Sequence, residues 1–206
     1  MLNNFFKIIY RLICIKLLFN WLNNKIKIYY NFIIPNLRFL ISKRIICDKN
    51  PICNQKTFFT GAGKIEIGDN CFFGYKLGGF HRGGSIEIQP RYKDSYIKIG
   101  NNIRTNNNFF FCAANYIEIG DNSYIGEHVT IIDYEAHAVD PYNRNDLGEI
   151  GKVIIGKNVW LGNNVTILKN SEIGENSIVG AGAVVAGKFP ANVIIGGIPA
   201  KVIKNL

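Results

Sequence analysis

Acidic residues are absent from the first 46 positions of this chain, which hold eight basic ones: Lys7, Arg11, Lys16, Lys25, Lys27, Arg38, Lys43 and Arg44. Of the 24 Lys and Arg in the chain, the other 16 are set against all 15 Asp and Glu. The formal net charge of +9 over 206 residues therefore belongs almost wholly to one end. Because the rest of the chain is nearly neutral, nucleic acid is not an expected partner.

A disulfide pattern is also missing. The five cysteines, Cys14, Cys47, Cys53, Cys71 and Cys112, include no C-x-x-C pair, and their odd number argues against a disulfide framework. A reducing compartment is the simplest setting for such a chain. We therefore expect a cytoplasmic protein, with a peripheral position at the inner face of the membrane left open.

Long charge-free hydrophobic runs are lacking too. None approaches the roughly 18 residues of a membrane-spanning helix, and no cleavage site of small residues follows a short apolar core. Residues 1–22 are instead apolar with interspersed basic residues, which predicts an amphipathic helix. A second apolar stretch, residues 28–41, contains Pro35, which should end or kink a helix there.

Residues 1–46 are thus predicted to be a basic, apolar helical segment, and two roles for it stay open. Lys and Arg beside Phe, Ile and Leu suit a membrane-surface anchor attracted by anionic lipid. A helical cap that packs within an oligomer would have the same composition. Residues 47–206 are expected to form the main domain.

A six-residue repeat dominates that domain. Aliphatic residues return every six positions in one run: Ile155, Leu161, Ile167, Ile173, Val179 and Val185. Interrupted copies of the form I-G-D/N-N begin at Ile67, Ile99 and Ile119. This period fits neither a helix nor an ordinary strand, and it predicts a mainly β solenoid with three short strands in each triangular coil. Asn and Gly are expected at the corners, where positive φ is needed.

Two stretches break the repeat. Residues 75–95 are rich in glycine, and residues 133–152 contain Pro141 and Gly148. We expect both to be protruding loops, which is where solenoid proteins commonly place function.

The run IGKNVWLGNNVTILKNSEIGENSIVGAGAVVAGKFPANVIIGGIPAKVI resembles the hexapeptide-repeat acetyltransferases of the maltose, galactoside and xenobiotic type, which include enzymes of surface polysaccharides. The resemblance covers residues 65–204. It implies a left-handed parallel β-helix, acetyl-CoA as co-substrate with no metal required, and a homotrimer whose active sites lie between subunits. The implied acceptor is a saccharide.

The histidine loop of that family has the form H-x-x-D-P-x-x-R, and this chain reads His137-Ala-Val-Asp140-Pro141-Tyr-Asn-Arg144. The resemblance implies that His137 is the general base, because an acceptor hydroxyl must lose its proton as it attacks the thioester. A loop histidine merely hydrogen-bonded by Asp140 is the alternative. His81 lies in a glycine-rich loop, where the simplest expectation is a flexible loop residue without a chemical role and contact with the acceptor is the alternative. His128 is expected to face outward from a repeat strand.

Three further residues are candidate contacts of the acceptor. Asn106 and Asn108 match an asparagine pair of the relatives, and Asn106 is assigned to the acceptor or the developing oxyanion. An asparagine ladder at a corner is the structural alternative. Glu149 resembles a glutamate that follows the histidine loop in galactoside-type members, although an ordinary solvated carboxylate explains it as well.

Coenzyme A is implied to lie along a groove marked by small residues, one tryptophan and basic residues near the end of the chain: Trp160, Asn163, Gly180, Ala181, Lys201 and Lys204. The lysines would meet its phosphates. Lys188 is displaced by one position from the family pattern, so its contact is left open.

The resulting hypothesis is acetyl-CoA-dependent O-acetylation of a sugar of a cell-surface polysaccharide or its precursor. N-acetylation of a nucleotide-linked amino sugar stays open, since the same base serves an amine. A γ-carbonic-anhydrase-like metal enzyme is less well supported, because the three histidines are 47 and 9 positions apart. A non-catalytic scaffold is the remaining alternative.

Overall fold

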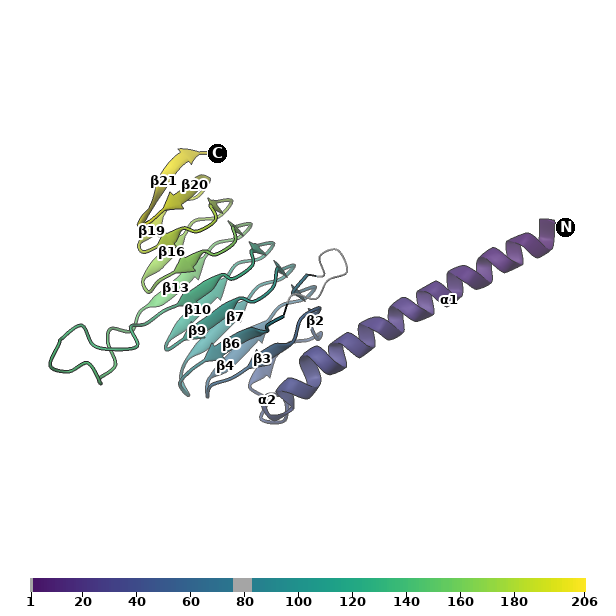
Figure 1. Cartoon of the computed structure of the whole chain (residues 1–206), viewed down its shortest axis with the longest axis horizontal. Coiled ribbons are helices and arrows are strands. Elements are labelled where there is room, and N and C mark those ends of the chain that lie inside the picture. Colours follow the sequence, from purple (N-terminus) through teal and green to yellow (C-terminus); the bar gives the residue numbers. More distant parts are fainter. Residues whose placement is uncertain (1, 76–82) are drawn as a thin grey trace.

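The computed structural model describes residues 2–75 and 83–206, with side chains from residue 12 onward. Three sheets of short parallel strands wind into one β-helix, and an amino-terminal helix projects from its first coil (Figure 1). The first sheet contains, in spatial order, β1 (Ile45–Ile46), β4 (Lys64–Ile67), β7 (Tyr96–Ile99), β10 (Tyr116–Ile119), β13 (Lys152–Ile155), β16 (Ser171–Ile173) and β19 (Lys188–Phe189).

The second sheet contains β2 (Ile52–Cys53), β5 (Phe72–Phe73), β8 (Arg104–Thr105), β11 (Tyr124–Ile125), β14 (Trp160–Leu161), β17 (Ile178–Val179), β20 (Val193–Gly197) and β21 (Ala200–Asn205). The third contains β18 (Val184–Val185), β15 (Thr166–Ile167), β12 (Thr130–Ile132), β9 (Phe110–Ala113), β6 (Ile86–Pro90) and β3 (Thr57–Phe59). Only the β20–β21 pair is antiparallel among the described strand pairs, and β21 thereby covers the last coil. The solenoid predicted from the repeat is confirmed, and so is the left-handed parallel β-helix that the resemblance implies.

The core is a stack of the repeat residues. Ile155 pairs in register with Ile173, so residues 18 positions apart meet on neighbouring coils of the regular run. On its other side Ile155 pairs with Ile119, which is 36 positions away because the loop after β12 lies between them. All six aliphatic residues of that run are buried, with at most 2% of their surface exposed. Removing apolar surface from water at every repeat is the main stabilising contribution to such a coil.

The corners use the left-handed backbone region, as the asparagine pattern predicted. Nine asparagines have a positive φ, among them Asn102, Asn122 and Asn176. At the first corner, between the first and second sheets, Asn102 Nδ2 donates to Asn122 Oδ1 over 2.9 Å, and further such bonds form an asparagine ladder. Asn tolerates this conformation because its short polar side chain hydrogen-bonds locally.

The amino-terminal segment is helical, as expected. It comprises α1 (Leu2–Ile28), a π-helical turn η1 (Tyr29–Ile33), a 3-10 turn η2 (Ile34–Asn36) and α2 (Leu37–Ile41). Pro35 lies in the tight 3-10 turn that interrupts the helix, in agreement with the sequence. Within the described residues, no helix combines the length and the apolar character needed to cross a membrane.

Two sequence expectations are corrected. The predicted loop 75–95 contains β6, whose Ile86 and Ile88 are fully buried. The prediction was wrong because the glycines and the proline nearby obscure the alternating pattern of this strand. His128 lies at the second corner, between the second and third sheets, with φ +56°, and not on a strand. It faces solvent as expected. His81 lies outside the described residues.

The amino-terminal segment closes the first coil through Asn36. This side chain is 1% exposed, and its Nδ2 donates to the Thr57 carbonyl over 2.7 Å while its Oδ1 accepts from the Phe59 N–H over 2.6 Å. Phe32 packs edge-on against the Phe59 ring beside it, with centroids 5.6 Å apart. The amide of Asn36 thus replaces the missing neighbour strand at the exposed edge of β3.

Replacing Asn36 by alanine should therefore destabilise the fold. The change leaves two buried backbone groups of β3 without partners, which costs about 2–4 kcal/mol in the free energy of unfolding. Denaturant unfolding of Asn36→Ala measures this. Asn24→Ala, at an exposed position of α1, is the matched control and should change the free energy by less than about 0.5 kcal/mol. Equal effects of the two substitutions would refute the capping role.

Candidate active site

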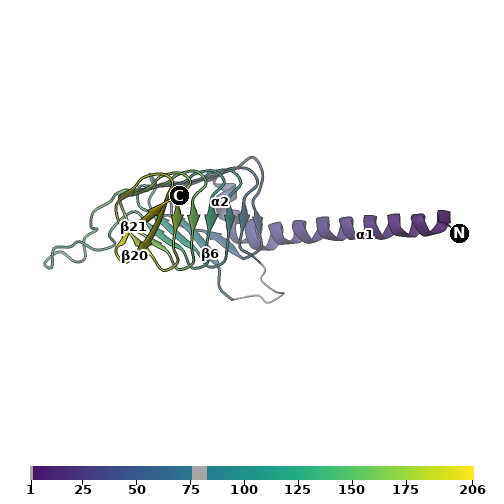
Figure 2. The same ribbon diagram turned by 90° about the horizontal axis from the view of Figure 1, so that it is seen from above.

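The loop of residues 133–151 leaves the coil at the third corner, between the third and first sheets. It projects from the coil on the side opposite to α1 (Figures 1 and 2). Its base is Asp133, whose fully buried carboxylate accepts the N–H groups of Ala114, Asn115 and Tyr116 over 2.6, 2.9 and 2.7 Å. Burial raises the pKa of Asp133, and these three hydrogen bonds act in the opposite direction. One carboxylate therefore closes the corner of the preceding coil and starts the loop.

The two arms of the loop pair with each other. Glu135 N–H donates to the Glu149 carbonyl over 2.9 Å, and Ala138 N–H donates to the Asp146 carbonyl over 2.8 Å. Near the tip, Asp140 accepts from the Tyr142 N–H over 3.0 Å and from Asn143 Nδ2 over 2.8 Å. The carboxylate of Asp140 therefore shapes the turn.

His137 is exposed on this loop, and its ring is oriented by the backbone. Nδ1 lies 2.7 Å from the Arg144 carbonyl oxygen. A carbonyl can only accept a hydrogen bond, so Nδ1 carries a proton, and in the neutral form of the ring Nε2 is the nitrogen that can act as a base. The Arg144 guanidinium in turn donates to the Ala138 carbonyl over 3.1 Å. The partner of His137 is thus a backbone carbonyl rather than Asp140.

Glu149 anchors the loop to the next coil. Its carboxylate contacts Lys169 Nζ and accepts from Asn170 Nδ2 over 3.0 Å, and Lys169 also lies 3.3 Å from Glu135 Oε1. The hydrogen bond to Lys169 lowers the pKa of Glu149 and raises the pKa of Lys169. Contact between Glu149 and an acceptor stays a prediction.

A groove of about 410 Å³ lies on the outer surface of the second sheet and reaches the second corner. It brings together three residues singled out from the sequence, Asn106, Trp160 and Asn163. Arg104 and Tyr124 also line it, and neither was identified from the sequence. Alignment of the repeats would have identified them, because Arg104, Tyr124 and Trp160 occupy the same outward position on neighbouring strands.

Both asparagines of the groove have their oxygen engaged inside the protein. Asn106 Oδ1 accepts the Asn107 N–H over 3.0 Å, and Asn163 Oδ1 accepts the Glu127 N–H over 2.8 Å. A backbone N–H can only donate, so each side chain has its oxygen turned inward. The NH₂ group of each is then the part available to a bound molecule.

Asn108 is placed differently. Its backbone N–H donates to Gln55 Oε1 over 2.8 Å, and its Oδ1 accepts from Gln55 Nε2 over 2.6 Å. It does not line the groove. The structure thus separates the predicted pair, with Asn106 in the groove and Asn108 paired within the second corner.

The predicted coenzyme-binding residues follow one outward row of the second sheet. Trp160 pairs with Ile178, Ile178 with Ile194, and Ile194 with Lys204. Strands lie about 4.8 Å apart, so Lys204 is roughly 14 Å from Trp160 along the row. Gly180 and Ala181 follow β17 at the corner beside this row, and Lys201 pairs with Gly196 on the covering strand.

The candidate residues therefore lie in two places on one chain. His137 is on the third corner's loop, and it does not line the groove that holds Asn106 and Trp160. The loop begins after β12 of the third sheet, whereas the groove lies on β8, β11 and β14 of the second. A single chain consequently separates the candidate base from the candidate binding groove.

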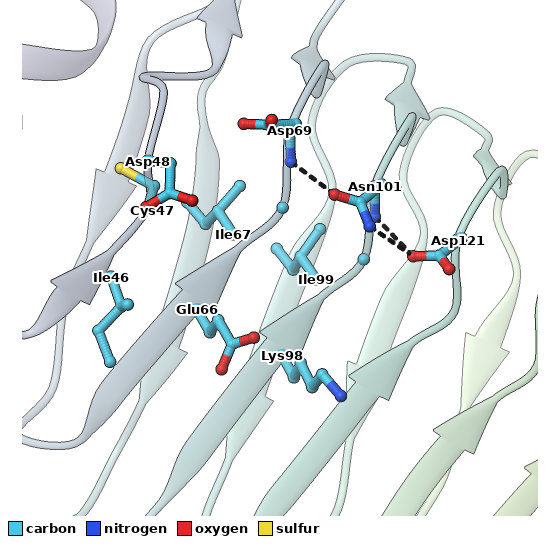
Figure 3. A pocket seen from close by; sticks show the side chains of 12 residues that line it. Ile46, Cys47, Asp48, Glu66, Ile67, Asp69, Lys98, Ile99, Asn101 and Asp121 are labelled. Atoms are coloured by element: carbon cyan, nitrogen blue, oxygen red, sulfur yellow. Dashed lines mark hydrogen bonds between the residues drawn. The ribbon is translucent and has the colours of Figure 1, made fainter.

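A second hollow, of about 440 Å³, lies on the first sheet and the first corner (Figure 3). At its corner, polar groups are engaged with each other: the Asp69 N–H donates to Asn101 Oδ1 over 2.9 Å, and the Asn101 N–H donates to Asp121 Oδ1 over 2.8 Å. The bond from Asn101, with Lys157 nearby, lowers the pKa of Asp121. None of the residues predicted for the site lies in this hollow.

Over the part of the chain that the structure describes, His, Cys, Asp and Glu form no group of three suited to a metal ion.

Comparison with known proteins agrees with this architecture. The family model described as bacterial transferase hexapeptide (six repeats) matches residues 152–187. A Dictyostelium discoideum protein named as an acetyltransferase is 40% identical over 129 residues, covering 60% of this chain and 67% of the relative. WbbJ of Escherichia coli, named as a lipopolysaccharide biosynthesis O-acetyl transferase, is 32% identical over 154 residues, covering 69% of this chain and 72% of WbbJ.

Solved structures share the fold. The polysialic-acid-specific acetyltransferase NeuO superposes with a TM-score of 0.62 at 23% identity, covering 78% of this chain and 66% of NeuO. Galactoside acetyltransferase in complex with coenzyme A superposes with a TM-score of 0.53 at 24% identity, covering 89% of this chain and 79% of that one. With the family model and the sequence relatives, these findings place the chain in a family of enzymes. It belongs to the hexapeptide-repeat acetyltransferases.

Proposed function

We propose that the chain is an acetyl-CoA-dependent O-acetyltransferase that acts on a sugar of a cell-surface polysaccharide or its precursor. The single observation that carries this proposal is the hydrogen bond from His137 Nδ1 to the Arg144 carbonyl, which leaves Nε2 as a base. Similarity to WbbJ and to a galactoside O-acetyltransferase of Escherichia coli supports a saccharide as the acceptor and a hydroxyl as the acceptor group.

The transfer proceeds in one bound complex. His137 Nε2 takes the proton of an acceptor hydroxyl as its oxygen attacks the thioester carbonyl. The tetrahedral intermediate carries a negative oxygen, which the Asn106 NH₂ group is free to stabilise. The C–S bond then breaks, the sulfur of coenzyme A receives the proton from the imidazolium, and the acetyl ester of the sugar remains. No acyl-enzyme is required, because the thioester is already activated.

The donor fits the outward row of the second sheet. An elongated thioester that extends from the groove along Trp160, Ile178 and Ile194 contacts a row of apolar side chains. Lys204 lies at the far end, with Lys201 on the same strand, and both are exposed. The Lys204 ammonium, roughly 14 Å from Trp160 along the row, suits the phosphates of coenzyme A. Gly180 and Ala181 leave space for the donor beside the row.

The separation of base and groove supports a homotrimer as the active form. Rotation about a three-fold axis makes head-to-tail contacts, in which one surface of a chain meets a different surface of its neighbour. The His137 loop of one chain then lies over the Asn106 groove of the next. Each active site takes its base from one subunit and its binding groove from another.

Removing the base should abolish transfer. We expect His137→Ala to lower the rate of acceptor-dependent thiol release from acetyl-CoA by about 10²–10⁴-fold, since a positioned base contributes about that much. His128→Asn is the matched control, because it removes an exposed histidine at a corner that accepts asparagine. A panel of neutral sugars, acidic sugars and amino sugars serves as acceptors. Full activity of His137→Ala, or acetylation of amines alone, would contradict the proposal.

The anchor of the loop gives a second prediction. Lys169→Met releases Glu135 and Glu149, so the base is held less well and kcat should fall roughly 10–100-fold. The KM for acetyl-CoA should stay unchanged, and Lys169→Arg should restore most of kcat. Lys157→Met, which removes an exposed ion pair with Asp121, is the control. A Lys169→Met enzyme with the kcat of the wild type would refute this positioning role.

A further inference from the structure

The amino-terminal segment presents a large apolar surface that the β-helix does not cover. From residue 12 to residue 26, every described side chain of α1 is exposed. Leu18 and Phe19 are 64% and 67% exposed, and the exposed apolar surface continues through Leu37 and Ile41 of α2. Both views show α1 projecting from the first coil without another element beside most of its length (Figures 1 and 2). The opposite side of the short helices is sealed by Phe32 and Phe39 against the coil.

Charge on this segment has one sign only. Its cations Lys16, Lys25, Arg38 and Lys43 form no ion pair within the described residues, and residues 1–46 contain no acidic residue. A cationic surface without internal compensation favours an anionic partner. Packing of α1 against the α1 of a second copy is disfavoured, because each copy brings unpaired positive charges to the contact and these repel each other.

Polar and aromatic residues are arranged as at a membrane–water interface. Within α1, a stripe of polar side chains recurs at helical spacing: Lys16, Asn20, Asn23, Asn24 and Lys27. Lys27 Nζ, at the end of this stripe, donates to Asn54 Oδ1 of the coil over 3.0 Å. Leu18 and Leu22 lie on the other face of the helix. Trp21 is 57% exposed and stacks with the Lys25 ammonium, 5.6 Å from the ring centroid. Amphipathic aromatic rings beside lysines are enriched at the headgroup level of bilayers.

We infer that the exposed side chains of residues 12–44 form a docking surface for a bilayer that carries anionic lipid headgroups. The apolar side chains of α1 and α2 enter the boundary between headgroups and acyl chains, and the unpaired cations contact the headgroups. The segment lies on the surface of the bilayer. This inference concerns location and does not depend on the acetyl-transfer reaction.

Vesicle flotation of the full chain tests it. Vesicles of phosphatidylcholine with about one third phosphatidylglycerol should retain the protein at least tenfold more strongly than phosphatidylcholine alone, and high salt should reduce this retention. The pair Lys16→Gln and Lys25→Gln should weaken retention about tenfold or more. The pair Lys56→Gln and Lys64→Gln removes the same charge from exposed positions of the coil and should have little effect. Equal retention by all vesicles and variants would overturn the inference.

Trp21 separates lipid from a second copy as the partner. Trp160 is the other tryptophan of the chain, so Trp160→Phe leaves Trp21 as the single tryptophan, whose emission can be excited selectively over that of tyrosine. Its emission should be that of a water-exposed indole in solution and should shift to shorter wavelength with anionic vesicles, with quenching by brominated lipids. A short emission wavelength without vesicles, unchanged by their addition, would show that α1 is buried between copies and would refute bilayer docking.

Discussion

In-register stacking of coils is the constraint on which the rest of the structure depends. Leu161 meets Ile125 and Val179 inside the coil because their strands are paired without slippage. The same register places their outward neighbours, Tyr124, Trp160 and Ile178, in one line on the second sheet. A slip of one residue would exchange core and surface. The pattern that builds the core therefore also builds the groove.

Stacking also determines where the chain tolerates an insertion. A loop at a corner interrupts no strand, provided that the backbone groups at its base find partners. Asp133 meets that condition by accepting three N–H groups from the coil below, and Lys169 holds the loop from the coil above. The loop can then carry His137 outside the corner while these contacts hold its base.

Sequence alone was sufficient for the periodic part of the fold and less so for its exceptions. The repeat predicted which aliphatic residues are buried, and asparagine predicted the corners. The sequence did not predict β6, because this strand has only five residues. It begins just after a glycine-rich stretch and ends at Pro90, so its alternating pattern is too short to recognise. The sequence also missed Arg104 and Tyr124, whose role emerges only when strands far apart in sequence are aligned. The motif identified His137, but its tautomer depends on the Arg144 carbonyl, which no side-chain pattern records.

The most direct test of a site shared between subunits is the activity of mixed oligomers. His137→Ala removes the base from one chain, and Asn106→Trp fills the groove of another. If each site uses the loop of one subunit and the groove of its neighbour, random mixing of the two inactive chains should restore about a quarter of the wild-type activity, because one neighbour pair in four combines an intact loop with an intact groove. Mixed oligomers without activity above that of the separate variants would contradict a site built from two subunits.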